Sequence, residues 1–264
     1  MDKYLIGKAF RLDSYTTYPC PSCGKDSLKH DKNKFHFQQT ASSLKNQYND
    51  YWDPEWIEEI FTSILICEDP KCKEVVACSG VGGVDWEILI NERGDQEQDF
   101  FSYYIPKTFT PTLKYINIPK ECPDSVKDNL NEAFSLTLLS PSSAANKVRA
   151  AVENLLTEFK IPRYKNRRKN GVTKGRRVFI SLHERIVLAE GKKTIFKELS
   201  NILIAIKWLG NEGSHATSGI TESDIFDAYR LIEHILNEIY SPQSKLQKRA
   251  EEITKNKGVK KVNK

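Results

Sequence analysis

The most informative segment of this sequence is Cys20-Pro21-Ser22-Cys23-Gly24. Two cysteines separated by two residues can turn both sulfurs toward one metal ion, and Gly24 eases the tight backbone that follows them. A structural zinc ion needs four ligands, so a second pair is expected elsewhere in the chain. Cys67-Glu68-Asp69-Pro70-Lys71-Cys72 is the best candidate, because its spacing falls within the usual range for zinc ligands. The sequence therefore predicts a structural zinc ion held by Cys20, Cys23, Cys67 and Cys72.

The residues around the second pair indicate a β-hairpin. Residues 61–67 and 74–78 are rich in isoleucine and valine, and Pro70 lies in the turn between them. Cys67 and Cys72 would then lie at the tip of this hairpin. Cys78 falls within the second strand and is expected to be a small buried hydrophobic residue rather than a ligand.

The compartment of the protein bears on the chemistry of its cysteines. All six lie in the first half of the chain, and the N-terminal residues do not resemble a secretion signal. Disulfides are disfavoured in such a chain, and metal ligation by thiolates gains weight. No apolar run approaches the ~18 residues that cross a bilayer, so we expect a cytoplasmic protein without a membrane-spanning segment. His30 and His36 lie between the cysteine pairs, and whether one of them, or Cys78, replaces a sulfur stays open.

The charge of the chain is unevenly distributed. Lys and Arg number 40 and Asp and Glu 35, which gives a net charge of +5. Residues 245–264 carry +6 and residues 162–177 carry +8, so the rest of the chain carries 5 − 14 = −9. Clustered cations can neutralise phosphates and release counterions, which makes residues 162–177 a candidate loop for binding RNA or DNA. The alternative is a solvated loop and a solubilising tail. The cations of the loop are Arg163, Lys165, Arg167, Arg168, Lys169, Lys174, Arg176 and Arg177.

The pattern of residues divides the chain into three parts and predicts an α+β protein. Residues 1–118 are expected to form a β-rich, zinc-ribbon-like module. Within it, residues 84–90 predict a further strand, residues 91–99 a polar loop and residues 103–119 an extended connector rich in proline. Residues 119–241 are expected to form a helical bundle domain. Residues 242–264 form a basic tail with few apolar residues, expected to be flexible or only partly helical.

Apolar residues at intervals of three and four predict the helices of the second part. They begin near Asp124, cover residues 144–159, then 182–189, then run from Thr194 to Gly210 and finally from Glu222 to Tyr240. The segment Ile202-Leu203-Ile204-Ala205-Ile206 has no polar face, as expected of a helix surrounded by others. The short connections fit a bundle of four or five helices.

One motif could carry chemistry. Lys207, Asn211 and His215 follow one another at intervals of four, so they share one face if helical geometry continues past Gly210. A histidine there could act as general base toward a ribose 2′-hydroxyl, with a nearby cation stabilising the developing charge, which would be metal-independent RNA cleavage. The alternative is an ordinary helix end, with Gly210 as the residue that terminates it and His215 hydrogen-bonded between helices.

Three segments together resemble the bacterial family known as domain of unknown function 4145. The first is Ile118-Pro119 followed by Val126 and Glu132-Ala133, and the second is Ala144-Ala145 leading into Arg149 and Glu153. The third is Gly210-Asn211-Glu212-Gly213-Ser214-His215. The upstream cysteine knuckle, followed by a second cysteine pair, is also similar to many members, so the resemblance covers about residues 17–240.

The resemblance implies a HEPN-like helical bundle, usually a dimer, in a family whose members often occur beside restriction and other anti-phage systems. Many HEPN proteins are RNases that use an arginine and a histidine near a helix end. His215 and Asn211 match that motif, whereas Lys207 stands where the family commonly has arginine. An ammonium does not grip a phosphate as a guanidinium does, so Arg149 is the candidate to supply the missing group.

These observations lead to two functional hypotheses. In the first, the chain is a defence-associated accessory protein that binds nucleic acid or a protein partner through the zinc-stapled module and the bundle, as a homodimer. In the second, it is a HEPN-like endoribonuclease that uses His215 and Asn211 with Lys207 or Arg149. DNA binding through the ribbon is disfavoured, because that region is acidic apart from a few lysines.

Overall fold

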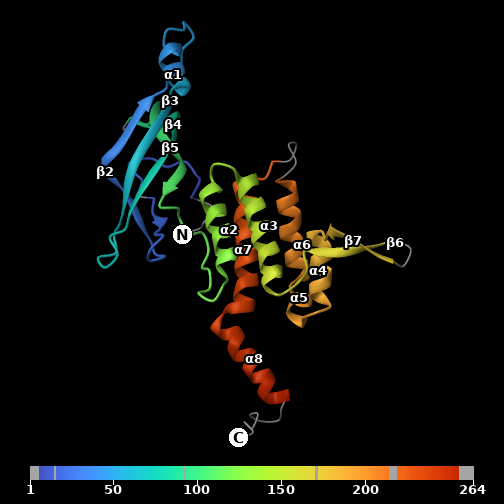
Figure 1. Cartoon of the computed structure of the whole chain (residues 1–264). Helices are drawn as coiled ribbons and strands as arrows, with labels where there is room; N and C mark the ends of the chain where they lie inside the picture. Colours follow the sequence, from blue (N-terminus) through green and yellow to red (C-terminus); the bar gives the residue numbers. More distant parts are fainter. Residues whose placement is uncertain (1–5, 15, 92, 170–171, 214–218, 256–264) are drawn as a thin grey trace. The chain divides into compact units, whose positions relative to one another are not determined.

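The structure of this chain is a computed structural model that describes residues 6–14, 16–91, 93–169, 172–213 and 219–255 (Figure 1). His215 lies outside the described residues. The chain divides into two compact units. The first comprises Met1–Tyr115 and Phe134–Ser140, and the second comprises Ile116–Ala133 and Pro141–Lys264.

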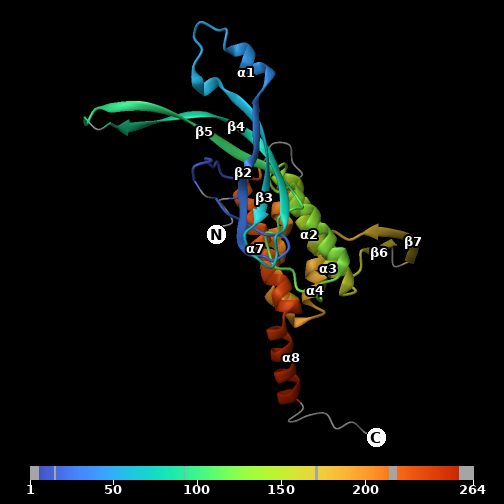
Figure 2. The same ribbon diagram turned by 90° about the vertical axis from the view of Figure 1, so that its left-hand side faces the viewer.

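The first unit is built on a five-stranded antiparallel sheet whose strands are paired in chain order. A short helix α1 (Ala41–Asn46) and a 3₁₀ turn η2 (Pro54–Trp56) lie between the second and third strands. Strands β4 and β5 extend well beyond the others as a long hairpin (Figure 2). The strands are β1 (Tyr18–Pro19), β2 (Asp26–Gln39), β3 (Glu58–Cys67), β4 (Val75–Ile90) and β5 (Gln96–Thr110).

Aromatic side chains form the core of this sheet. Phe61 on β3 stacks on Phe35 with ring centroids 5.1 Å apart and meets Tyr104 of β5 at 5.4 Å. Alternate residues of β3 are buried, and this alternation includes Leu65 and ends at Cys67. The period of two thus places Cys67 on the core side of the sheet, at the very end of its strand.

The sheet differs from the sequence-based prediction in four places. Strand β5 begins at Gln96, within the polar loop predicted for residues 91–99. Strand β4 is continuous from Val75 to Ile90, so the two strands predicted there are one. Residues 103–110 belong to β5 and not to an extended connector, because they pair with residues 77–83 of β4. Strand β2 was not predicted, because its sequence contains many charged residues and shows no clear alternation of apolar and polar residues.

The second unit is helical and carries a two-stranded hairpin. Helix α3 packs against α6 and α7, and α6 packs against α4. The order of a β-sheet followed by helices confirms the α+β prediction. No helix within the described residues is long and apolar enough to cross a membrane. The elements are α2 (Asp124–Leu136), α3 (Pro141–Glu158), β6 (Tyr164–Lys169), β7 (Val172–Phe179), α4 (Leu182–Glu190), α5 (Thr194–Glu198), α6 (Ser200–Glu212), α7 (Glu222–Tyr240) and α8 (Pro242–Lys255).

The helix predicted from Thr194 to Gly210 begins at Thr194 as expected, but the prediction is wrong in its middle and at its C-terminal end. The helix is broken at Leu199, which closes α5 and opens α6, and α6 continues to Glu212. Gly210 does not terminate the helix. A glycine is needed there for another reason, since its missing side chain makes room for Arg149 of α3. A Cβ at Gly210 would lie 2.6 Å from the Cβ of Arg149. Helix α6 is also less enclosed than predicted, since Ile202, Ile204 and Ala205 are only half-buried.

The segment expected to be a basic loop is a β-hairpin. Strands β6 and β7 pair antiparallel from Tyr164 opposite Phe179 to Lys169 opposite Val172. The ladder is extended at its base by a bond of 2.9 Å from the Ile180 amide to the Arg163 carbonyl.

Candidate functional site

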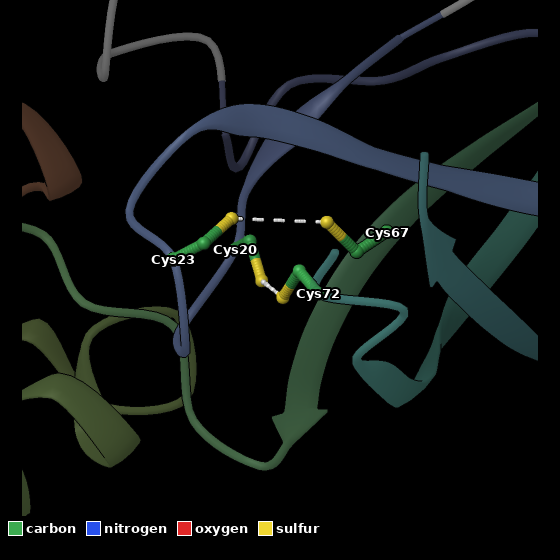
Figure 3. A group of neighbouring side chains, drawn as sticks. All are labelled: Cys20, Cys23, Cys67 and Cys72. Carbon is green, nitrogen blue, oxygen red and sulfur yellow. Dashed lines mark hydrogen bonds between the residues drawn. The ribbon is translucent and has the colours of Figure 1, made fainter. Parts of the chain in front are cut away.

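Two neighbouring turns of the sheet each present a pair of cysteines. Cys20 and Cys23 lie in the turn between β1 and β2, and Cys67 and Cys72 border the turn between β3 and β4. Leu28 of β2 pairs with Cys67, which places the two turns side by side. The four Sγ atoms lie within 4.8 Å of one another, and all four cysteines are free thiols (Figure 3). The structure thus brings together the residues selected by their spacing, in a group that could hold a metal ion.

Each turn passes through the left-handed backbone region directly after its second cysteine. Gly24 follows Cys23 with φ +73°, and Lys73 follows Cys72 with φ +54°. A Cβ at Gly24 would meet no atom within 4 Å, so this backbone conformation, and not crowding, favours glycine there. Lys73 adopts the same left-handed conformation although it is not a glycine. The sequence of the second turn therefore lacks the glycine that made the first turn recognisable as a knuckle.

The backbone surrounds the sulfurs with hydrogen-bond donors. Amides of Ser22 and Cys23 donate to the sulfur of Cys20, the amide of Asp69 donates to Cys67, and that of Glu74 donates to Cys72. Such donors favour the thiolate form that metal binding requires. The same pattern in both turns makes them a matched pair of ligand loops.

The thiols differ in how readily they lose a proton. Burial raises the pKa of Cys20 to about 12. Burial also acts to raise the pKa of Cys67, but hydrogen bonds from Ser27, from the Asp69 amide and from the thiols of Cys23 and Cys72 together outweigh it and lower that pKa to about 7. Ser27 Oγ lies 3.0 Å from Cys67 Sγ. A bound divalent cation would hold all four sulfurs as thiolates.

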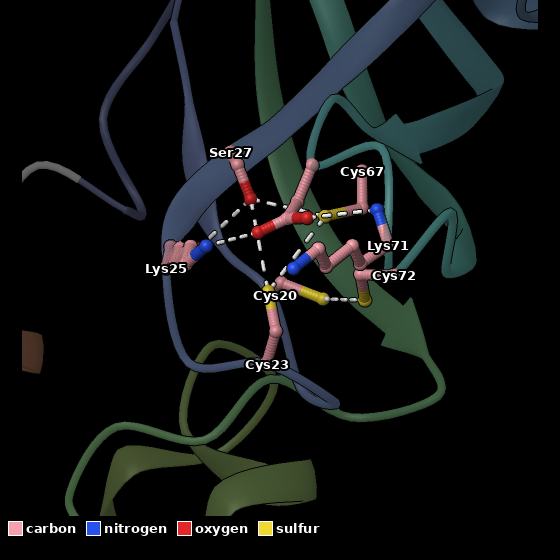
Figure 4. Close-up of polar contacts among 8 residues, drawn as sticks. Cys20, Cys23, Lys25, Ser27, Cys67, Lys71 and Cys72 are labelled. Carbon is pink, nitrogen blue, oxygen red and sulfur yellow. Dashed lines mark hydrogen bonds and ion pairs between the residues drawn. The ribbon is translucent and has the colours of Figure 1, made fainter.

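Polar side chains join the two ligand loops. Lys25, from the first loop (Figure 4), forms an ion pair with Asp69 of the second. Ser22 of the first loop donates a hydrogen bond to Glu74, which follows the second. Asp69 also accepts a hydrogen bond of 2.9 Å from the Lys71 amide, which fixes the turn between the cysteines. These contacts hold the loops together independently of the sulfurs. Neither pair between the loops could be recognised in the sequence, because they join residues 44 and 52 positions apart.

The three alternative ligands lie elsewhere in the first unit. His30 bonds through Nδ1 to Ser63 Oγ at 2.8 Å, and its ring stacks on Phe10 at 4.5 Å. Burial lowers the pKa of His30 to about 4. Cys78 lies on β4, opposite Ser63, and burial raises its pKa to about 12. His36 is exposed on β2. Among the described residues, only the four cysteines form the cluster.

A hydrogen bond between two helices joins residues of the helical motif. Arg149 of α3 donates from Nη1 to Asn211 Oδ1 at 2.7 Å, and its Nε lies 3.4 Å from Glu153. Lys207 lies on the same face of α6 as Asn211, with Nζ 3.3 Å from the centroid of the Trp208 ring. The structure therefore brings Arg149 to Asn211, as the resemblance suggested.

The basic hairpin presents the other predicted site. Arg163, Lys165 and Arg177 are exposed, and the backbone places Arg167, Arg168, Lys169, Lys174 and Arg176 in the same two strands. The sequence analysis overlooked Tyr164 and Phe179, which pair across the base of the hairpin and are each 54% exposed. In the sequence, Tyr164 and Phe179 lie near the two ends of the basic segment 162–177, and this position could have identified them as part of the site.

Comparison with known proteins matches the two halves of the chain to two different family models. Residues 131–256 match the family model described as Domain of unknown function (DUF4145), which confirms the resemblance of the helical half. Residues 8–109, which include the four cysteines, match a separate model described as Domain of unknown function (DUF8608). No curated protein and no solved structure matches the chain.

Proposed function

We propose that this chain is a non-catalytic, nucleic-acid-binding accessory protein whose β-rich unit is stabilised by a structural zinc ion. The basic β6–β7 hairpin is the contact surface for the nucleic acid. The association with an anti-phage or restriction system, the homodimer and a protein partner remain predictions that rest on the resemblance of the helical half.

The sulfur geometry supports zinc. Cys20 Sγ lies 3.6 Å from Cys72 Sγ, and Cys23 Sγ lies 3.8 Å from Cys67 Sγ. A tetrahedral zinc ion with bonds of ~2.3 Å to sulfur separates its ligands by about 3.8 Å. Four thiolates would leave no open position for a substrate, so the ion would supply folding energy rather than catalysis.

Elemental analysis of the purified chain tests this centre. We expect one zinc ion per chain, and loss of that zinc in Cys67→Ser together with a lower unfolding temperature. Cys122→Ala is the matched control, because Cys122 is equally buried but belongs to the helical unit. Retention of stoichiometric zinc by Cys67→Ser would refute the assignment.

The charge of the hairpin is the observation that carries nucleic-acid binding. Eight cations and no acid lie between residues 163 and 177, on a two-stranded ribbon. A ribbon of this kind can lie along a phosphate backbone or enter the major groove of a duplex. Each phosphate contact releases counterions, so binding should weaken steeply as salt increases.

Fluorescence anisotropy with labelled oligonucleotides at several salt concentrations tests the hairpin. We expect Arg177→Gln to weaken binding and to reduce the salt slope by about 1, for one lost phosphate contact. The control is Lys45→Gln, which removes one exposed cation from the first unit. Absence of binding to any DNA or RNA, with capture of a protein partner instead, would overturn the proposal in favour of a protein-binding module.

The contact between Arg149 and Asn211 favours a second candidate, a metal-independent endoribonuclease. It places a guanidinium beside the polar residue of the motif, where Lys207 alone would grip a phosphate poorly. Labelled RNA incubated with the protein and EDTA separates the two functions. Cleavage that disappears in His215→Ala and in Arg149→Lys, with the fold retained, would establish the nuclease.

A further inference from the structure

The two faces of the β6–β7 hairpin have different surroundings. Side chains alternate between the faces of a strand, so Arg163, Lys165 and Val178 share one face. On this face Lys165 forms an ion pair of 2.7 Å with Glu184 of α4. Arg163 donates from Nη2 to Asn154 of α3 at 3.1 Å. Polar contacts therefore join this face to helices α3 and α4.

The opposite face is open and carries an aromatic pair. Tyr164 and Phe179 are cross-strand neighbours whose rings meet edge to face, with centroids 5.8 Å apart. Each residue is 54% exposed, although both rings are large and apolar. Two exposed rings that contact each other form an apolar patch of the kind that marks a binding surface, and their shape suits a ligand with flat apolar faces.

The next pair along the same face is polar and cationic. Asn166 lies opposite Arg177, and both are exposed. No acidic partner of Arg177 occurs in the part of the chain that the structure describes. The open face therefore offers two rings and then a guanidinium and an amide, in a segment that holds no acid.

We infer that this face binds single-stranded nucleic acid, with unpaired bases stacking on Tyr164 and Phe179 while Arg177 contacts a phosphate. The inference rests on the proposed function and specifies its ligand. A duplex keeps its bases stacked on one another and offers no free base face along its length, whereas every unpaired base offers one. The cations of the hairpin disfavour an apolar protein partner and complement a polyanion.

The test compares four ligands on the full chain by fluorescence anisotropy. They are a labelled single-stranded DNA, the RNA of the same sequence, the corresponding DNA duplex and an abasic oligomer with the same number of phosphates. Tyr164→Ala should weaken binding of both single strands by about tenfold, since stacking on an aromatic ring is worth that much per base. Binding of the abasic oligomer should not change, and Tyr164→Phe should retain full affinity because the ring is kept.

Two further variants separate stacking from charge. Arg177→Ala should lower the salt slope by about 1, whereas Tyr164→Ala should leave that slope unchanged. Tyr48→Ala, which removes an aromatic side chain that is 91% exposed in the first unit, should leave every affinity unchanged. Phe179→Ala provides an independent test of the platform should Tyr164→Ala not fold.

Failure of this inference differs from failure of the proposed function. If the aromatic variants weaken binding of the abasic oligomer as much as that of the single strands, or affect none of the ligands, stacking is refuted while hairpin binding stands. Tighter binding of the duplex than of either single strand would also refute the inference alone. If wild-type protein binds none of the four ligands, the proposed function falls and the inference falls with it.

Discussion

Nη1 of Arg149 on α3 lies 2.7 Å from Oδ1 of Asn211 on α6 and donates a hydrogen bond to it. Glu153, one turn further along α3, lies 3.4 Å from Nε of the same guanidinium. Arg149 therefore links its own helix to the end of another. Since the side chain of Arg149 is 29% exposed, this link is partly shielded from water, and it should be detectable in the stability of the protein.

The first prediction concerns this link. Arg149→Ala and Asn211→Ala should each lower the free energy of unfolding, and the double variant should lose about 1 kcal/mol less than the sum of both. Urea unfolding of the three variants measures this coupling. Arg149→Lys should behave like Arg149→Ala, because a single ammonium cannot reproduce the fork of donors. Strictly additive losses would show that the two residues are not coupled.

Close packing of helices leads to the second prediction. A Cβ on Gly213 would lie 2.5 Å from the carbonyl oxygen of Ser142, in the first turn of α3. Because that neighbour is backbone, Gly213→Ala should destabilise the chain by about 1–3 kcal/mol. Gly191→Ala is the matched control, since Gly191 also caps a helix but its nearest atom would be 3.9 Å away. It should be neutral or slightly stabilising in thermal unfolding, and equal effects of the two substitutions would count against the packing.

The third prediction links metal binding to pH. The pKa of Cys20 in the chain alone is about 12 and that of Cys67 about 7, so zinc binding at neutral pH must displace protons. Protons therefore compete with the ion, and the affinity for zinc should fall as pH decreases, by up to about tenfold per pH unit for each proton displaced. Competition with a chelator of known affinity measures the slope. Cys122→Ala should leave the slope unchanged, and an affinity that does not vary with pH would contradict thiolate ligation.

The fourth prediction concerns His30. Its pKa is about 4 in the folded chain, lowered by burial from 6.5. Between about pH 6.5 and pH 4, His30 binds a proton in the unfolded chain but stays neutral in the folded chain. The free energy of unfolding should therefore decrease as pH falls from about 6.5 to about 4. This loss amounts to roughly 2–3 kcal/mol. His30→Phe, which keeps the ring against Phe10, should remove that part of the pH dependence in urea unfolding. Acid also releases metal from both proteins, so the comparison is the difference between wild type and variant, and identical curves would refute the assignment.

Local patterns in the sequence were sufficient wherever the deciding interactions are close along the chain. Helices α4 and α7 were predicted nearly to the residue, because each begins with a capping box and repeats its apolar residues every three or four positions. The two cysteine pairs were recognisable for the same reason, since ligand spacing within a loop is local. That they share one centre was an inference from coordination chemistry, and it required the structure to bring them together.

Interactions between distant segments decided the rest. Strand β2 exists because it pairs with β3, and the continuous β4 exists because β5 pairs with nearly all of it, although neither strand has a clear pattern of its own. Gly210 lies inside α6 and not at its end, and it is glycine because Arg149, 61 positions earlier, fills the space that a side chain would need. The local sequence carries the propensities and the chemistry of each residue, whereas pairing and packing depend on neighbours that come together only when the whole chain has folded.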